Sequence, residues 1–129
     1  MRLPVKILLQ IIDRPVARFS GSGHKRALGR IELQTPATLF PIEDELIGTG
    51  IHVTLKDISA ETAGMSAPQA LMPFSSILLS IPMREGPDLF IRCRVTRCVR
   101  GKYGEFALAA DFVQIVDPKK MRAANAHRA

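Results

Sequence analysis

Alternation of apolar and polar residues with a period of two restricts the fold of this chain more than any other feature. The clearest runs are 51–56, 91–96 and 106–112. Every second side chain there is apolar, which is the pattern of a strand with one face in a core and the other in solvent. Apolar segments at 36–42, 62–67 and 75–81 bring the total to about six closely spaced strands. This pattern predicts an all-β protein, an antiparallel barrel or sandwich.

The N-terminal part follows a different pattern. Apolar residues recur at helical spacing over 4–12, and Asp13-Arg14-Pro15 provides a stop, so a short helix is expected. Both sides of this helix are apolar. Residues 3–12 therefore either pack on the chain's own core or contact a second copy or another protein. The following segment, 18–24, is rich in Gly and Ser and predicts a flexible link.

The positive charge is concentrated at the two ends of the chain. The formal net charge is +6, and residues 1–30 carry seven basic side chains and one acidic one. Residues 117–129 carry four basic and one acidic, whereas the body between them has seven basic and ten acidic. A nonspecific DNA-binding face is usually spread over the folded body. A basic arm beside a compact body therefore fits a small anionic ligand at least as well. The shortage of aromatic residues, six Phe and one Tyr, argues against a barrel that stacks single-stranded nucleic acid.

Composition and spacing exclude several classes of protein. No apolar run approaches the ~20 residues that span a bilayer, so no membrane span is expected. Two cysteines, Cys93 and Cys98, are too few for a disulfide scaffold, and their odd spacing predicts opposite faces of one strand. These features indicate a reducing compartment such as the cytoplasm. The histidines lie far apart, and the chain has no P-loop, dinucleotide fingerprint or Ser–His–Asp arrangement. We therefore expect no enzyme, metal site or cofactor.

Two short motifs carry the chemistry that is present. The first, Arg26-Ala27-Leu28-Gly29-Arg30, is an Arg-x-x-x-Arg sequence in the basic arm, directly after Lys25. The second, Asp57-Ile58-Ser59, ends a predicted strand about thirty residues later. In this order, with a β-barrel pattern following, they resemble the PilZ domain, a family of bacterial receptors for cyclic di-GMP built on a six-stranded antiparallel barrel. Residues 90–95 and 104–108 also look like the closing hairpin of that family.

The resemblance covers roughly residues 24–116 and divides the chain into three parts. Residues 1–23 would form an N-terminal apolar segment and flexible basic arm, and 24–116 the PilZ-like β-barrel. Residues 117–129 would form a basic C-terminal helix or tail, in which Pro118 can open a short helix through 119–126.

The resemblance also implies a function. The chain would bind cyclic di-GMP and signal to a downstream protein by ordering its N-terminal arm, without catalysis. Arg26 and Arg30 would clamp the ligand, Lys25 would add a contact, and Asp57 and Ser59 would hold a guanine edge. These residue types suit the ligand, because a guanidinium donates two parallel hydrogen bonds to guanine O6 and N7 or to a phosphate. A carboxylate accepts from guanine N–H groups.

Plainer interpretations stand beside these assignments. The two arm arginines could be solvated charges, and Asp57-x-Ser59 could be turn chemistry closing a strand. Four further arginines are expected on the solvent side of one strand, where one of them could line the site: Arg92, Arg94, Arg97 and Arg100.

One position departs from the family pattern Asp-x-Ser-x-x-Gly. Thr62 stands where the glycine would be, and Gly64 follows two residues later. If two extra residues bulge outward, Gly64 replaces that glycine beside the ligand; we favour this interpretation because an even insertion preserves strand alternation. If Thr62 fills the position instead, its Cβ crowds the ligand. The alternative function is a degenerate PilZ-like barrel that serves as a protein-interaction module without binding a nucleotide.

Overall fold

Strands make up most of the structure. The structure is a computed structural model, and it describes residues 1–12, 18–19, 29–120 and 122–123. The six long strands are β2 (Ile31–Glu43), β4 (Ile51–Ile58), β5 (Thr62–Ala67), β6 (Ser76–Ile81), β7 (Leu89–Arg100) and β8 (Phe106–Ile115). The remaining elements are short: helix α1 (Val5–Ile12), strands β1 (Arg18–Phe19), β3 (Leu46–Ile47) and β9 (Arg122–Ala123), and the 3₁₀ turn η2 (Pro118–Lys120).

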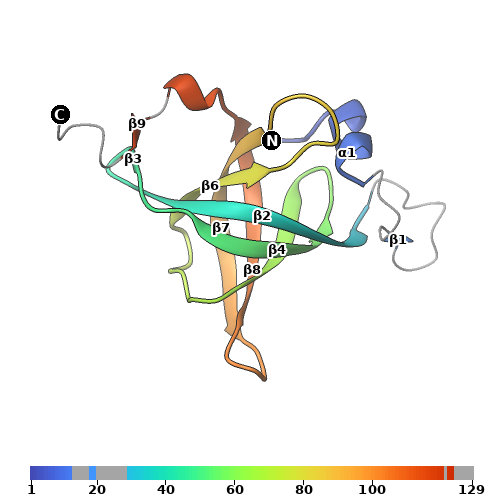
Figure 1. Cartoon of the computed structure of the whole chain (residues 1–129). Helices are drawn as coiled ribbons and strands as arrows, with labels where there is room; N and C mark the ends of the chain where they lie inside the picture. The colour runs from blue at the N-terminus through green and yellow to red at the C-terminus, as the bar shows by residue number, and fades with distance from the viewer. Residues whose placement is uncertain (13–17, 20–28, 121, 124–129) are drawn as a thin grey trace.

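The long strands close into an antiparallel barrel (Figure 1). Their hydrogen-bonded order is β4-β5-β8-β7-β6-β2, and β2 pairs with β4 to complete the circle. The fold class is thus confirmed, and each predicted strand segment falls largely within one long strand. The expected hairpin between β7 and β8 is present, where the Gly101 N–H donates to the Glu105 carbonyl at 2.7 Å.

The barrel interior is filled by the apolar side chains of the alternating pattern, and α1 covers it from outside the sheet. Leu39, Leu55 and Leu79 are fully buried in the same cluster as Leu8 and Ile11 of α1. One face of residues 3–12 therefore packs on the chain's own core, whereas Val5 and Leu9 are exposed. A contact of this segment with a second copy or another protein stays a prediction. Figure 1 shows α1 near β1 at one end of the barrel.

Two terminal predictions were wrong in part. Of the C-terminal helix expected over 119–126, the described residues form η2 and then β9, which pairs in parallel with β3, while 121 and 124–126 lie outside the described residues. The Asp117 carboxylate accepts a hydrogen bond from the Lys119 N–H at 3.0 Å and caps this single turn. The link expected over 18–24 begins with β1, which pairs with β2; the rest of it lies outside the described residues.

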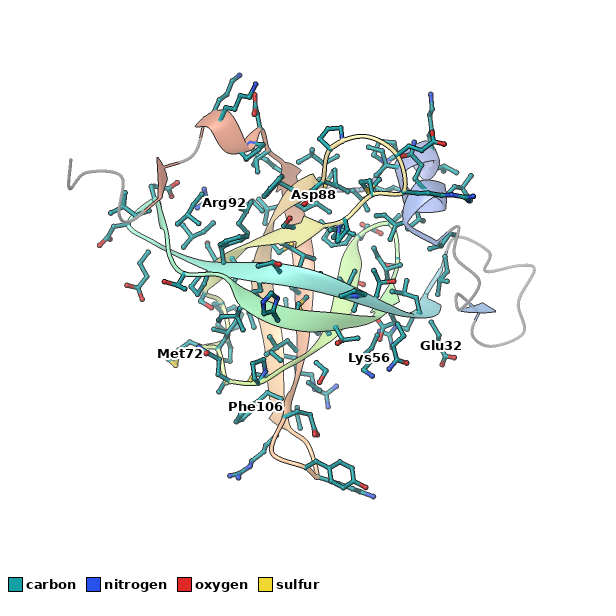
Figure 2. The ribbon with its side chains drawn as sticks, viewed as in Figure 1. Glu32, Lys56, Met72, Asp88, Arg92 and Phe106 are labelled. Atoms are coloured by element: carbon teal, nitrogen blue, oxygen red, sulfur yellow. The ribbon has the colours of Figure 1, made fainter. Side chains whose placement is uncertain are left out.

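The strand pairs contain four register shifts, in β2, β4, β7 and β8, and the shifts in β4 and β7 shape the surface described below. In β4, Leu55 pairs with Met65 and Asp57 pairs with Gly64, so Lys56 is an extra residue. Figure 2 shows Lys56 projecting away from the barrel. In β7, Thr96 is extra, because Val95 pairs with Ala110 while Arg97 pairs with Ala109. An extra residue moves every following side chain to the other face.

The β7 bulge overturns the prediction for the cysteines. Five positions of strict alternation would separate Cys93 and Cys98 onto opposite faces, but the extra residue turns both inward. Cys93 is fully buried, and the half-buried Cys98 packs against the same core. Both remain free thiols.

Candidate functional site

An open pocket of about 460 Å³ lies on the outer surface of the barrel. We call it the sheet pocket, and the lining residues that matter here are Arg30, Asp57, Thr62, Gly64, Arg97, Ala107, Ala109 and Asp111. Strand register explains its shape. Asp57, Gly64, Ala109 and Arg97 are successive cross-strand partners on β4, β5, β8 and β7. The two middle members of this row are the smallest residues, so the surface is hollow between two polar ends.

Asp57 and Gly64 fit each other directly. A Cβ added to Gly64 would lie 2.6 Å from Asp57 Oδ2 and 2.8 Å from Oδ1. Real Cβ atoms essentially never make non-bonded contacts this short, so only glycine at position 64 leaves room for the carboxylate where it stands. Gly64 also lines the pocket.

Arg30 and Asp57 meet at one end of the sheet pocket. The Arg30 Nε lies 3.6 Å from Asp57 Oδ1, with 68% of the arginine side chain and 27% of the aspartate side chain exposed. Such an exposed pair contributes only about 0–1 kcal/mol to stability. The contact therefore orients two side chains more than it stabilises the fold. In this structure Asp57 therefore holds an arginine.

Ser59 is occupied by the turn between β4 and β5. Its hydroxyl oxygen accepts from the Thr62 N–H at 3.1 Å and lies 2.9 Å from the Thr62 hydroxyl. The Ser59 N–H donates to the Thr62 carbonyl at 2.9 Å, which closes the hairpin over two residues. Ser59 is not among the lining residues of the sheet pocket. It acts through turn chemistry, the plainer of its two interpretations.

The same turn overturns the interpretation that we favoured for the displaced glycine. β5 begins at Thr62 with no outward bulge between Ser59 and Gly64, and Thr62 pairs with Asp111. Thr62 therefore fills the position at which the family pattern has glycine, and it lines the sheet pocket. The turn is tight because the two hydroxyl-bearing residues bond to each other across it.

The structure thus brings together three of the six predicted binding residues. Arg30, Asp57 and Gly64 line one pocket, Ser59 supports the turn beside it, and Lys25 and Arg26 lie outside the described residues.

The four arginines of β7 divide into distinct roles. Arg92 donates two hydrogen bonds of 2.8 Å to the Glu45 carboxylate, and Arg94 lies 5.5 Å from the centre of the Phe74 ring. Figure 2 shows Arg92 on the side of the barrel where β3 lies. Among the four, only Arg97 lines the sheet pocket. Arg97 was among the four arginines of which one was expected to line the site, but the sequence could not single it out, because the bulge after Val95 sets its position.

The sheet pocket contains two guanidinium groups and two carboxylates, from Arg30, Arg97, Asp57 and Asp111. Such a balance suits a ligand that presents both acceptors and donors rather than a simple anion. No group of three His, Cys, Asp or Glu side chains able to hold a metal ion occurs among the described residues. Within the same ranges, no helix is long and apolar enough to cross a membrane.

Comparison with known proteins adds to this picture through the fold alone. No protein-family model matches the sequence, and no curated protein matches it significantly. Among solved structures, the barrel is similar to the inhibitor of motility MotI/DgrA of Bacillus subtilis, with a TM-score of 0.54 and 14% sequence identity. The match covers 70% of this chain but only 43% of that protein. MotI/DgrA is a PilZ-domain protein, so the chain described here has a PilZ-like barrel.

Proposed function

We propose that this chain is a receptor domain that binds cyclic di-GMP reversibly in the sheet pocket and carries out no catalysis. One observation carries the proposal. Arg30 and Asp57, which stand far apart in the sequence, lie 3.6 Å apart at one end of a hollow that Gly64 keeps open. Both belong to the motifs on which the resemblance to PilZ domains rests.

The chemistry of this end matches two adjoining edges of guanine. The Hoogsteen edge has acceptors at O6 and N7, and the Watson–Crick edge has donors at N1 and N2. Arg30 can donate to the acceptors or to a phosphate, and Asp57 can accept from the donors. A bidentate arginine contact to guanine contributes roughly 1–3 kcal/mol to discrimination. The small residues between the polar ends let a flat base or a sugar approach the sheet closely.

The basic arm supplies the remaining contacts in this proposal. Phe19 and Ile31 are paired across β1 and β2, so the two positions that flank residues 20–30 lie side by side. Arg26 is four residues from Arg30, a reach of at most about 14 Å, which lets Arg26 and Lys25 contact the same ligand. Ordering of the arm around the ligand would carry the signal to a downstream protein.

Calorimetric titration with cyclic di-GMP tests the proposal. We expect saturable binding, weakened about 5- to 150-fold by Arg30→Ala or Arg26→Ala, with an unchanged thermal midpoint. Arg84→Ala, which alters an exposed arginine of the β6–β7 connection outside the pocket, is the matched control. Amide hydrogen exchange at 24–30 should slow at saturating ligand. Wild-type affinity in the Arg26→Ala/Arg30→Ala double variant would refute the clamp.

One observation favours a second candidate, a barrel that acts only as a protein-interaction module. Thr62 fills the position at which the family pattern has glycine and lines the pocket, while Ser59 is held in the turn. If neither the native protein nor Thr62→Gly binds cyclic di-GMP, this second function replaces the first.

A further inference from the structure

A second arginine and a second carboxylate line the sheet pocket: Arg97 on β7, at the opposite end of the row from Asp57, and Asp111 on β8, the partner of Thr62. They lie diagonally, since Arg97 pairs with Ala109, two residues before Asp111. Diagonal neighbours on one face of a sheet are within reach of long side chains. Neither side chain forms a hydrogen bond or an ion pair within the part of the chain that the structure describes.

The two bulges produce this arrangement. If β4 had no bulge at Lys56, regular alternation from the inward-facing Leu55 would point Asp57 into the core as well. Without Thr96, Arg97 would follow Val95 into the core in the same way. Both Leu55 and Val95 are fully buried. Each bulge therefore turns one polar residue outward, and the two residues occupy opposite ends of the same row.

The separation of these ends suits a ligand with two bases. Asp57 and Arg97 are three strand spacings apart, roughly 14 Å at about 4.8 Å per step before the curvature of the barrel is considered. One arginine–aspartate pair cannot reach both ends of a row of that length. The two bases of one cyclic dinucleotide extend from opposite sides of its sugar–phosphate ring, and the row between Asp57 and Arg97 holds only the small residues Gly64 and Ala109.

We propose that Arg97 and Asp111 recognise the second guanine of the ligand, so that a single cyclic dinucleotide lies across β5 and β8 with each guanine held by its own arginine and carboxylate. This inference rests on the proposed function. It makes Arg97 a specificity-determining residue. Adenine presents an N6 donor where guanine presents the O6 acceptor, so an arginine fork at this end rejects it.

A ligand series tests the inference. Wild-type protein and Arg97→Ala are titrated with cyclic di-GMP and with cyclic GMP–AMP, which has one guanine replaced by adenine. We expect Arg97→Ala to lower cyclic di-GMP affinity about 5- to 150-fold. It should leave cyclic GMP–AMP affinity nearly unchanged, so that discrimination between the ligands is lost. Arg97→Lys, which keeps the charge but not the fork, should lose discrimination too.

Each alternative result has a definite meaning. Arg97→Ala with wild-type affinity for cyclic di-GMP overturns the inference. Equal losses for both ligands also overturn it, because they indicate general charge attraction. Arg84→Ala should bind cyclic di-GMP as the wild-type protein does. If Arg84→Ala loses as much affinity as Arg97→Ala, the inference is also overturned, because the loss then reflects general charge attraction. If the wild-type protein binds no cyclic dinucleotide, the proposed function fails first and the inference fails with it.

Discussion

The close contact between Gly64 and the Asp57 carboxylate leads to a prediction about protein stability that can be tested without a ligand. Gly64→Ala places a methyl group 2.6–2.9 Å from three atoms of the Asp57 carboxyl group, so the carboxyl group must turn away. Moving it to a poorer rotamer costs about 0.5–1.5 kcal/mol, and losing the exposed Arg30 contact costs about 0–1 kcal/mol. Replacing glycine also restricts the unfolded chain, which returns about 0.4–1 kcal/mol. The net effect should be small, between about 0.5 kcal/mol of stabilisation and about 2 kcal/mol of destabilisation.

A double-mutant cycle isolates the steric contact from these opposing effects. In an Asp57→Ala background the obstructing carboxyl group is absent, so Gly64→Ala should stabilise the protein by about 0.4–1 kcal/mol. Urea unfolding of the four proteins should therefore give a coupling free energy of about 1–2 kcal/mol between the two positions.

The matched control for this cycle is Gly50→Ala. The Cβ at that position would meet Phe40 and Thr38, so its effect should be the same with and without Asp57. A coupling between Gly64 and Asp57 no larger than that of the control would refute the steric argument. Where ligand binding is measured, Gly64→Ala should also weaken it, because Asp57 no longer stands at the end of the pocket.

Thr62→Gly should raise affinity for cyclic di-GMP, because it removes the Cβ from the pocket, and should lower the free energy of unfolding by about 1 kcal/mol through the lost Ser59 hydroxyl contact. Thr62→Ser, which keeps the Cβ and the hydroxyl group, is the control in the calorimetric titration. Reduced affinity in Thr62→Gly would contradict the crowding argument. The hydrogen bonds and charge of Arg92 hold the pKa of Glu45 below its ordinary 4.5, so this carboxylate stabilises the fold above that pH and the contribution is lost as pH falls through the lowered pKa. The difference in thermal midpoint between wild type and Glu45→Gln should therefore shrink from pH 7 to pH 3 (roughly the range over which a carboxyl group with a lowered pKa titrates), and a constant difference would count against the pair. Burial, and secondarily Asp111, raise the pKa of the Cys93 thiol to about 12, so a Cys98→Ala variant should resist thiol reagents at about pH 8 until urea unfolds it; rapid labelling of the folded variant would be the opposite result.

The barrel could be predicted because burial of one strand face imposes a two-residue period on the sequence. Ile51, Val53 and Leu55 follow that period, and they occupy one strand with its inner face in the core. The C-terminal segment lacks such a constraint. Its backbone adopts one 3₁₀ turn and then pairs with β3, a partner remote in the sequence.

The candidate site could be predicted only in part. The two motifs identified Arg30 and Asp57, which the fold brings together, whereas Arg26 and Lys25 stay predictions. Arg97 was predicted only as one of four arginines on the solvent side, since the bulge that sets its position arises from how two strands pair. The position of Gly64 was misjudged for a related reason. Counting residues from Ser59 could not show that hydroxyl groups at 59 and 62 would close the turn.

The bulge at Thr96 has a consequence for how such a surface could arise or be lost during evolution. A substitution changes one side chain. Inserting or deleting one codon in β7 instead turns every following side chain of the strand to the other face, so that inward residues point outward and outward residues point inward. Loss of one residue at this point would send Arg97 and Val99 inward and Cys98 outward in a single event. No short path of single substitutions is equivalent. A protein with this polar row therefore differs from one without it in the length of β7. Sequence alignments that penalise gaps within strands will score two such barrels as dissimilar even when they share nearly all their residues.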